Sequence, residues 1–264
     1  MTGSRSRLEL EVRNGAGIMT LNRPDRGNVI DLPFGREFRA AAYEIADNHE
    51  IRALLIRASG SQFCVGGDLK SMREAASDPS AFLLELTQDL HAGMAVMARM
   101  DAPVVAEVRG TAAGAGLGIV LASDLVIAAP EAKFLSAYSA VALTPDAGCT
   151  FNLPRIVGVR RAMEMFLLNR VLGAEEALAW GIVNQVIAAE ELGTVALKLV
   201  ERLASGPRGA HGALKRLLAD SVPGFELQLG RESQNIAARG ASAEGREGIS
   251  AFLDKRKPDF RAPD

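Results

Sequence analysis

Cysteine and histidine are scarce in this 264-residue chain, and their scarcity limits the chemistry that it can support. The two cysteines, Cys64 and Cys149, lie far apart in apolar surroundings, which favours buried thiols in a reducing compartment over a disulfide. The three histidines are scattered, and the cysteines are not paired at a spacing typical of zinc ligands. The sequence therefore predicts neither a disulfide framework nor a structural metal site.

Long apolar runs and a net charge of one sign are also lacking. No run approaches the roughly 18 residues of a membrane-spanning helix. The chain starts with a short basic lead and then an alternating strand pattern, without an apolar signal segment. A net charge of −2 gives no electrostatic reason to expect nucleic acid or an anionic membrane as a partner. We therefore expect a cytoplasmic protein that binds neither nucleic acid nor a membrane.

Several common catalytic motifs are incomplete. The loop GAGLG over 114–118 is similar to a dinucleotide-binding loop, but Ile119 stands where the third glycine is required. The stretch HEIRA over 49–53 begins like a zinc-protease helix and has Ala53 in place of the second histidine. No serine lies in a G-x-S-x-G or S-x-x-K pattern, so serine-nucleophile chemistry has no support.

What the sequence does contain is an alternation of short apolar segments with helical spacing. The pattern predicts strands over 8–12, 18–21, 53–58, 104–108, 125–128 and 133–135, the first two forming a hairpin. It predicts helices over 32–47, 79–100, 160–168, 174–180, 192–204, 210–219, 225–239 and 243–254. Strands that alternate with helices predict an α/β fold with mainly parallel pairing. We expect a β/α core over residues 1–190 and a helical region over 191–264.

One arrangement occurs twice in the predicted core. The strands over 53–58 and 104–108 each run into a glycine-rich bend, FCVGGDL over 63–69 and GTAAGAGLG over 110–118. Such bends let a ligand approach the backbone, and the first N–H groups of a following helix are free. Two such N–H groups facing one point would form an oxyanion hole. Close packing of helix on strand accounts for the same pattern, so the residues alone leave both interpretations open.

A single acid lies in the apolar stretch AYSAVALTPDAGCT over 137–150. Asp146 is the only acidic residue between Glu131 and Glu164. The segment T-P-D-A-G is also favourable turn chemistry, because Pro145 sets φ and an aspartate can bond to nearby backbone. Local sequence therefore permits either a turn residue or a catalytic acid.

Several segments together carry a family resemblance. They are LNRPDRGNVI over 21–30, FCVGGDL over 63–69, RGTAAGAGLGIVLASDLVIA over 109–128, LTPDAGCTFNLPRIVG over 143–158, AEEALAWGIVNQVI over 174–187 and FLDKRKPDF over 252–260. In this order the chain resembles the crotonase, or enoyl-CoA hydratase/isomerase, superfamily over nearly its whole length. The resemblance implies a ββα spiral core, a helical C-terminal trimerisation region and a homotrimer or dimer of trimers. It also implies an acyl-CoA thioester substrate and no cofactor, because coenzyme A enters with the substrate.

The resemblance also implies the catalytic groups. The backbone N–H groups of Gly67 and Ala115 would hold the thioester carbonyl. Hydratases of the family use two glutamates, and collinear matching places those positions at Gly118 and Tyr138, so the standard hydration groups are absent. Asp146 stands where aspartate-containing isomerases of phenylacetyl-CoA degradation have their acid. The resemblance therefore favours an isomerase in which Asp146 shuttles a proton.

Other reactions remain open on the same residues. The 4-chlorobenzoyl-CoA dehalogenase branch has an aspartate nucleophile at the position of Asp146 and a histidine that falls at His91. It has a tryptophan at the position of Tyr138, so this part of its site is not reproduced. His91 is thus a candidate catalytic residue, although a packed histidine is the commoner outcome in mid-helix. A hydrolase or dehalogenase, a hydratase in which Asp146 alone positions water, and an acyl-CoA-binding scaffold without turnover are the alternatives.

The resemblance also implies a set of substrate-binding residues. The segment containing Arg26, Asn28 and Val29 would meet the nucleotide of coenzyme A, partly through its backbone. Lys255 and Lys257 could reach the phosphates, on this or a neighbouring subunit, because phosphate binding favours basic side chains. The full set is Arg26, Asn28, Val29, Val65, Asp68, Leu69, Tyr138, Lys255 and Lys257. From the residues alone, Asp68 is as well explained as an anchor of its bend, and the two lysines as a solvated helix end.

Overall fold

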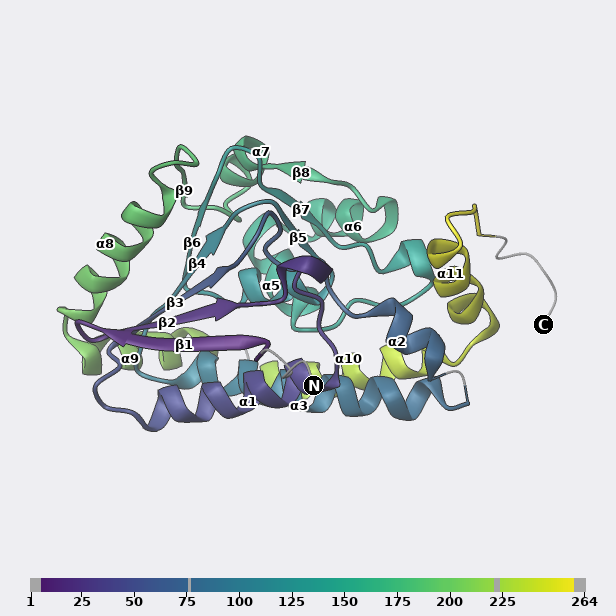
Figure 1. The fold of residues 1–264 in the computed structure, drawn as a ribbon, viewed down its shortest axis with the longest axis horizontal. Helices are drawn as coiled ribbons and strands as arrows, with labels where there is room; N and C mark the ends of the chain where they lie inside the picture. Colours follow the sequence, from purple (N-terminus) through teal and green to yellow (C-terminus); the bar gives the residue numbers. More distant parts are fainter. Residues whose placement is uncertain (1–5, 76, 221–223, 259–264) are drawn as a thin grey trace.

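A six-stranded sheet forms the centre of the computed structural model, which describes residues 6–75, 77–220 and 224–258 (Figure 1). Its strands follow the order β1-β2-β3-β4-β6-β9. They are β1 (Leu8–Arg13), β2 (Ala16–Leu21), β3 (Ala53–Ala58), β4 (Val104–Val108), β6 (Leu125–Ala128) and β9 (Gln185–Val186). β1 pairs with β2 in antiparallel fashion, and every other pairing in this sheet is parallel. The predicted α/β fold with mainly parallel pairing is therefore confirmed.

The predicted hairpin is present, but its second strand starts earlier than expected. β2 begins at Ala16, because Asn14 and Gly15 alone make the turn with φ values of 52° and 79°. Positive φ at both central residues is the geometry of a two-residue turn that matches the twist of the flanking strands. The strands predicted over 8–12 and 18–21 leave a longer turn between them than the structure has.

A second sheet has three strands and was only partly predicted. It contains β5 (Thr111–Ala113), β7 (Lys133–Leu135) and β8 (Leu172–Gly173). The predicted strand over 133–135 is β7, whereas β5 was missed. The backbone of Cys64 pairs with this sheet, since its N–H donates to Thr111 O (3.1 Å) and its carbonyl accepts from Ala113 N (2.9 Å). This pairing places the two glycine-rich bends side by side.

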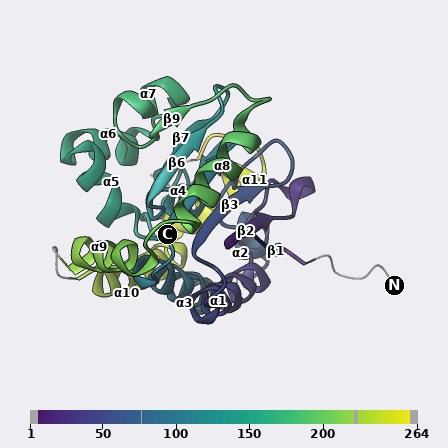
Figure 2. The ribbon, with the colours of Figure 1, turned by 90° about the vertical axis from the view of Figure 1, so that its left-hand side faces the viewer.

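Helices cover both faces of the six-stranded sheet (Figures 1 and 2). Successive side chains of a strand point to opposite faces. Ile18, Leu55 and Val105 therefore pack on one face with α8 (Leu192–Ala204). On the other face, Met19 and Leu54 belong to a larger core with α1 (Leu32–Asp47) and α3 (Pro79–Arg99). The predicted helices over 32–47 and 192–204 coincide with α1 and α8.

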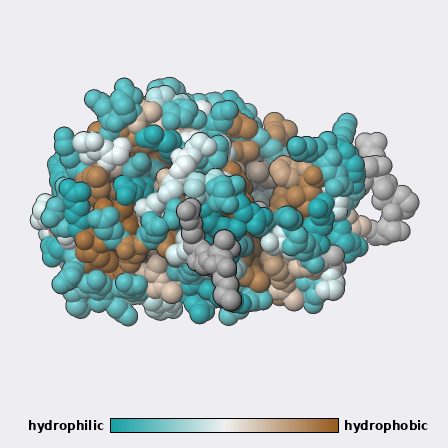
Figure 3. All heavy atoms as spheres, viewed as in Figure 1, coloured by the Kyte–Doolittle hydropathy of each residue, from teal (hydrophilic) through white to brown (hydrophobic). Residues whose placement is uncertain are grey.

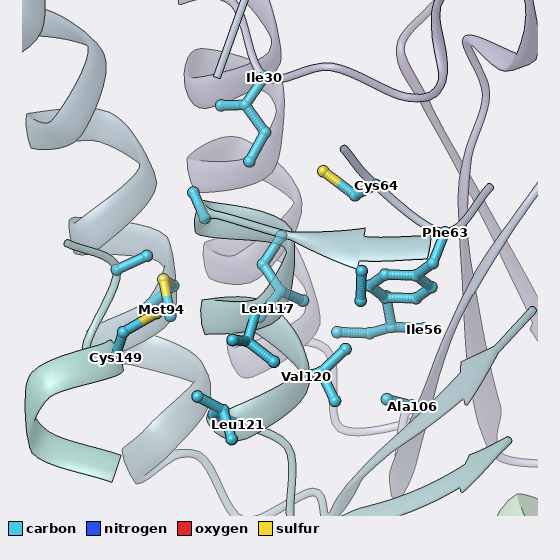
Figure 4. Packing of buried hydrophobic residues seen from close by; sticks show 14 of the residues in the cluster. Ile30, Ile56, Phe63, Cys64, Met94, Ala106, Leu117, Val120, Leu121 and Cys149 are labelled. Atoms are coloured by element: carbon cyan, nitrogen blue, oxygen red, sulfur yellow. The ribbon is translucent and has the colours of Figure 1, made fainter. Parts of the chain in front are cut away.

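Helix α4 (Ala115–Leu121) lies inside this larger core, and all seven of its residues are buried. Figure 4 shows Leu117, Val120 and Leu121 between Met94 and Cys149 on one side and Phe63 and Ile56 on the other. A helix surrounded by protein must be apolar on all sides. Its composition of alanine, glycine, leucine, isoleucine and valine meets that requirement.

The remaining helices surround this core. They are α2 (Leu69–Glu74), α5 (Cys149–Val157), α6 (Val159–Leu168), α7 (Ala174–Ala179), α9 (Arg208–Asp220), α10 (Phe225–Gly240) and α11 (Ala243–Leu253), with short 3₁₀ turns at η1 (Pro24–Arg26) and η2 (Ser139–Val141). For two of these the sequence predicted no bounds. α2 has only six residues, and α5 contains Pro154 and has no side-chain cap from its own N-cap residue. Local helix signals are weak in both.

The predicted division at residue 190 falls between β9 and α8, so the C-terminal region begins with a helix that packs on the sheet. Residues 1–5 and 259–264 of the two predicted regions lie outside the described residues, as do the last two residues of the 252–260 motif. Among the described residues, no helix combines the length and the apolar character needed to cross a membrane.

Asp31 joins the edge of the sheet to the start of α1. Its carboxylate accepts a hydrogen bond from Phe34 N (2.9 Å) at the first turn of α1. It also accepts two from Arg7 (2.7 and 3.1 Å) and one from Arg23. Burial disfavours the ionised carboxylate, but the hydrogen bonds from Arg7 and Phe34 and the charges of both arginines outweigh burial and lower the pKa of Asp31.

Replacing Asp31 by asparagine should destabilise the fold at neutral pH. We expect a loss of about 1–3 kcal/mol in the free energy of unfolding, because the arginines lose their ionised partner and α1 its charged cap. Because the folded pKa lies below the ordinary value of 3.8, the contribution is complete above pH 3.8 and is lost as the pH falls below it. Denaturant unfolding at neutral pH and below pH 3.8 measures both effects. A difference between wild type and Asp31→Asn that does not shrink on acidification would contradict this account.

Candidate active site

A cavity of about 290 Å³ lies where the two glycine-rich bends meet the segment over 136–146 and helices α2, α3, α10 and α11. Much of its wall is apolar and includes Leu83, Leu86, Leu90, Val141, Leu143 and Ile236. Phe252 and Leu253 at the end of α11 complete it, and Phe252 is mostly exposed. On the face shown in Figure 3 an apolar patch lies beside the hydrophilic surface of α11. The cavity thus suits an apolar group that enters from solvent.

Two backbone donors face this cavity without partners. Gly67 and Ala115 both line it, and neither N–H makes a hydrogen bond within the part of the chain that the structure describes. Their bends are in contact, because a Cβ placed at Gly66 would lie 3.0 Å from the carbonyl oxygen of Ala113. Gly66 also has a φ of 92°, which only glycine adopts easily. Two free N–H groups from neighbouring bends on one cavity wall are the arrangement that an oxyanion hole requires.

Asp146 lies buried on the same wall, with its two carboxylate oxygens in different surroundings. Tyr138 donates its hydroxyl hydrogen to Oδ1. Oδ2 lies 3.6 Å from Nε2 of His91 and accepts no hydrogen bond from any described residue. One oxygen is therefore held in place, and the other is available for proton transfer.

Tyr138 has a second role beside the predicted one. It lines the cavity, as its place among the predicted substrate-binding residues requires, and it also binds the acid. Burial and then the negative charge of Asp146 raise the pKa of the Tyr138 phenol well above 10. The phenol therefore stays protonated and remains a hydrogen-bond donor at neutral pH.

The space beside Gly118 is filled by the turn that follows Asp146. A Cβ placed at Gly118 would lie 2.5 Å from both the Cβ and the carbonyl oxygen of Ala147. A side chain at position 118 would therefore force this turn to move. With Tyr138 at the other position, neither of the two matched hydratase positions supplies a carboxylate here.

The turn after Asp146 is held by two buried side chains from distant helices. Ala147 N–H donates to Nε2 of His91 on α3 (3.1 Å), and Gly148 N–H donates to Oε2 of Glu232 on α10 (2.7 Å). Glu232 Oε1 accepts from the backbone N–H of Thr150 (3.3 Å) and from its hydroxyl. Burial raises the pKa of Glu232, although the hydrogen bonds from Thr150 and Gly148 oppose this shift.

Glu232 is not among the predicted site residues, although the sequence carries a signal for it. The buried stripe of α10 contains Phe225, Leu229, Glu232 and Ile236, which follow helical spacing. A carboxylate on an apolar stripe needs a buried partner, because an unpaired buried charge is costly. The spacing thus marks Glu232 as unusual but does not identify its partner.

Several predicted substrate-binding side chains are engaged within the protein. Asn28 is buried and binds the backbone of Arg23, Ser59 and Gln62. Asp68 lies on the cavity wall, but its carboxylate caps α2 and pairs with Arg26 at 3.1 Å. Both side chains therefore position their loops, and Asp146 is the carboxylate left on this wall for chemistry.

The other predicted site residues divide into two groups. Val29, Val65, Leu69 and Tyr138 line the cavity with Gly67, Ala115 and Asp146. Arg26, Asn28, His91, Lys255 and Lys257 do not line it, and the two lysines are exposed beyond α11. Their contacts with coenzyme A stay predictions. Within the described residues, no group of three or more His, Cys, Asp and Glu side chains is placed to hold a metal ion.

Comparison with known proteins gives matches over almost the whole chain. The model of the enoyl-CoA hydratase/isomerase family matches residues 11–263. A 1,2-epoxyphenylacetyl-CoA isomerase of Escherichia coli (strain K12) is 36% identical over 253 residues, which cover 94% of this chain and 96% of that protein. The 4-chlorobenzoyl coenzyme A dehalogenase-2 of Arthrobacter sp is 32% identical over 257 residues, which cover 96% of this chain and 93% of that protein.

A solved structure agrees in fold. The crystal structure of an enoyl-CoA hydratase from Mycobacterium avium subsp. paratuberculosis K-10 has a TM-score of 0.85 and 32% identity, and the match covers 97% of this chain and 99% of that chain. The three relatives are named for three different reactions. Similarity therefore leaves the choice of reaction to the chemistry of the site.

Replacing Tyr138 by phenylalanine should remove a late step from the alkaline titration of the protein. The chain has two tyrosines, and the pKa of Tyr138 is raised well above 10 by burial and by Asp146. Its ionisation should therefore coincide with loss of the native fold as the pH rises. Tyrosinate absorbance and circular dichroism, followed together, measure the step and the unfolding. Tyr43→Phe is the matched control and should retain the step, whereas a Tyr138→Phe protein that retains it would contradict the assignment.

Proposed function

The chain belongs to the enoyl-CoA hydratase/isomerase family, as its motifs predicted, and we propose that it is an isomerase. As a member of this family it is an acyl-CoA-transforming enzyme. The proposed reaction is isomerisation of an enoyl-CoA or ring-type acyl-CoA thioester. One observation carries the choice of reaction. Asp146 is the carboxylate available on the cavity wall, while Gly118 and Tyr138 stand at the two positions that the family resemblance matches to hydratase glutamates.

In the proposed reaction the thioester carbonyl oxygen accepts hydrogen bonds from the N–H groups of Gly67 and Ala115. These donors stabilise the negative charge that develops on that oxygen when a neighbouring C–H bond breaks. Oδ2 of Asp146 takes the proton, and the electron pair of the broken bond delocalises onto the thioester as an enolate. The protonated Asp146 then returns the proton to a different carbon, so the double bond moves and no proton is gained or lost overall.

A single carboxylate is sufficient for this reaction but is poorly suited to hydration. Addition of water needs one group to activate the water and usually a second to protonate the carbon. Tyr138 holds Oδ1 of Asp146, which leaves one oxygen for one proton. The apolar wall of Leu83, Leu86 and Leu90 also disfavours ordered water next to the acyl group.

A second reaction has one specific observation in its favour. His91 Nε2 lies 3.6 Å from Oδ2 of Asp146, a pairing that suits an aspartate nucleophile with a histidine that activates water. The similarity to a 4-chlorobenzoyl coenzyme A dehalogenase points in the same direction. The same Nε2 accepts a hydrogen bond from Ala147 N–H, however, and His91 does not line the cavity. We therefore rank a hydrolase or dehalogenase second.

The proposal includes an assembly of three subunits or a pair of trimers. Large apolar side chains are exposed on α6, where Val159, Leu167 and Leu168 are 66%, 64% and 73% exposed, and on α9, where Leu217 is 72% exposed. Apolar exposure of this extent favours contact with another copy of the chain. We also propose a cytoplasmic location, in which the buried thiols stay reduced, and no cofactor beyond the coenzyme A of the substrate.

Replacing Asp146 by asparagine should abolish turnover and leave acyl-CoA binding nearly intact. We expect kcat to fall by about 10²–10⁴-fold, because the amide cannot accept and return the proton. A panel of enoyl-CoA and aromatic acyl-CoA thioesters, followed by NMR in deuterated water, reports double-bond migration, hydration and deuterium wash-in. Glu131→Gln, at an exposed acid outside the cavity, is the control.

Other outcomes of this panel would favour the alternatives. Full isomerase activity in the Asp146→Asn protein would exclude the proposed mechanism. Halide release together with a trapped aspartyl-acyl adduct would establish the nucleophilic reaction instead. Tight binding without turnover of any thioester would leave an acyl-CoA-binding scaffold.

Replacing Leu168 by glutamate should break the assembly, because a charge at a buried subunit contact is costly. The wild type should have the mass in solution of a trimer or of a pair of trimers of the 28.0 kDa chain. The variant should approach the mass of a single chain. Size-exclusion chromatography with light scattering measures both. Val12→Glu, at an exposed apolar residue on the edge strand β1, should keep the assembly. A wild type of 28.0 kDa would disprove the trimer.

A further inference from the structure

The backbone directly after Asp146 adopts an unfavourable conformation. Ala147 and Gly148 are consecutive residues with φ values of 51° and 70°. Glycine tolerates this region, but alanine rarely occupies it, so the turn needs support from its surroundings. Gly118 packs against the Ala147 side chain and carbonyl, which leaves the N–H side of the turn to be held by other groups.

Two side chains supply that support, one for each amide. His91 accepts from Ala147 N–H at 3.1 Å, and Glu232 accepts from Gly148 N–H at 2.7 Å. Both side chains are buried, at 6% and 3% exposure. Because Glu232 also binds Thr150, it caps the first turn of α5, which has no side-chain cap of its own. His91 on α3 thus holds the N–H of Ala147, and Glu232 on α10 holds the N–H of Gly148.

The hydrogen bond from Ala147 defines what His91 can do. A ring nitrogen that accepts a hydrogen bond carries no proton, so Nε2 is not a donor to Asp146 in this arrangement. His91 does not line the cavity of the candidate site but a separate one of about 410 Å³ between α3 and α10. Its ring is therefore placed to hold the backbone and not to touch a substrate.

The two helices that carry these side chains are themselves joined. The hydroxyl of Thr87 on α3 shares a hydrogen bond with the hydroxyl of Ser233 on α10. Thr87 lies one helical turn before His91, and Ser233 follows Glu232. The spacing between the two acceptors is thus fixed by a direct contact between their helices.

We propose that His91 and Glu232 are positioning residues, which together clamp the backbone amides of Ala147 and Gly148 and so fix the carboxylate of Asp146 against Tyr138. The inference rests on the proposed function and deepens it. It assigns Glu232 a role in the reaction and gives His91 a role that needs no proton transfer.

Two substitutions of His91 separate positioning from acid–base chemistry. Glutamine can place its side-chain oxygen near the position of Nε2 and accept from Ala147 N–H, whereas leucine cannot accept. We expect kcat of His91→Leu to fall by about 10²-fold, since a small misplacement of a catalytic group has effects of this size. His91→Gln should retain at least about tenfold more kcat than His91→Leu, with equal affinities for a saturated acyl-CoA. An equal loss of kcat in both variants would overturn the proposal. It would mean that an acceptor for Ala147 N–H does not restore activity and that the imidazole is needed as a proton-transferring group.

Glu232→Gln tests the other half of the clamp. Its amide has one acceptor oxygen, so it can hold Gly148 N–H or the Thr150 group but not both. We expect kcat to fall by about tenfold with no change in the dissociation constant of a saturated acyl-CoA. Glu226→Gln on the same helix, where the side chain pairs with Arg99 at the surface, is the matched control. Wild-type kcat in Glu232→Gln, or an equal loss of binding and turnover, would contradict the clamp.

The two proposals can fail separately. If Asp146→Asn stays active, the isomerase mechanism is wrong whatever His91 and Glu232 do. If Asp146→Asn is inactive but His91→Gln is as slow as His91→Leu, only the clamp is wrong. Adding Glu232→Gln to the Asp146→Asn protein should cause no further loss of residual turnover, because residues that act through one group are not additive. Thermal unfolding of each variant shows whether it is folded, and the near-isosteric glutamine variants decide the result if the leucine variant is not.

Discussion

Contact of helix α4 with two other backbone segments is the constraint on which the site depends. A Cβ at Gly116 would lie 2.3 Å from the carbonyl oxygen of Cys64, and a Cβ at Gly118 would lie 2.5 Å from Ala147. Glycine at both positions lets one short helix touch the first bend on one side and the acid turn on the other. The free N–H of Ala115, at the start of this helix, is thereby brought between the two. A single methyl group at either glycine would push α4 away from one of these segments.

The same contact limits where a carboxylate can lie. Because the turn after Asp146 fills the space next to Gly118, that position of α4 has no room for a side chain, and the turn itself places the carboxylate of Asp146 on the cavity wall. A turn positions an acid less precisely than a helix does. The buried hydrogen bonds around this turn compensate for that difference. Tyr138, His91 and Glu232 all bind the acid or the two residues after it.

The predictable part of the structure is the part that is encoded locally. Apolar periodicity located α1, α8, β3 and β4 at their observed bounds, since each buries one face or both along its own length. β5 was missed because its three residues form a strand by pairing with β7 and with the backbone of Cys64, contacts that its own short sequence does not indicate. Motif resemblance found the cavity residues Gly67, Ala115 and Asp146, yet the bond from Tyr138 to Asp146 and the part played by Glu232 depend on contacts across the fold. The amide of Asn28 is a similar case, because nothing local indicates that it binds the backbone of Ser59 and Gln62.

The position of Glu232 along the chain has a consequence for biosynthesis. Gly148 and Glu232 are 84 residues apart, so the turn that carries Asp146 emerges from the ribosome well before the side chain that caps it has been made. A growing chain can form the sheet, both glycine bends and α4 while its acid still lacks one of its two backbone anchors. The turn that carries Asp146 can have both of its backbone acceptors only after residue 232 has been translated and α10 has packed on α3.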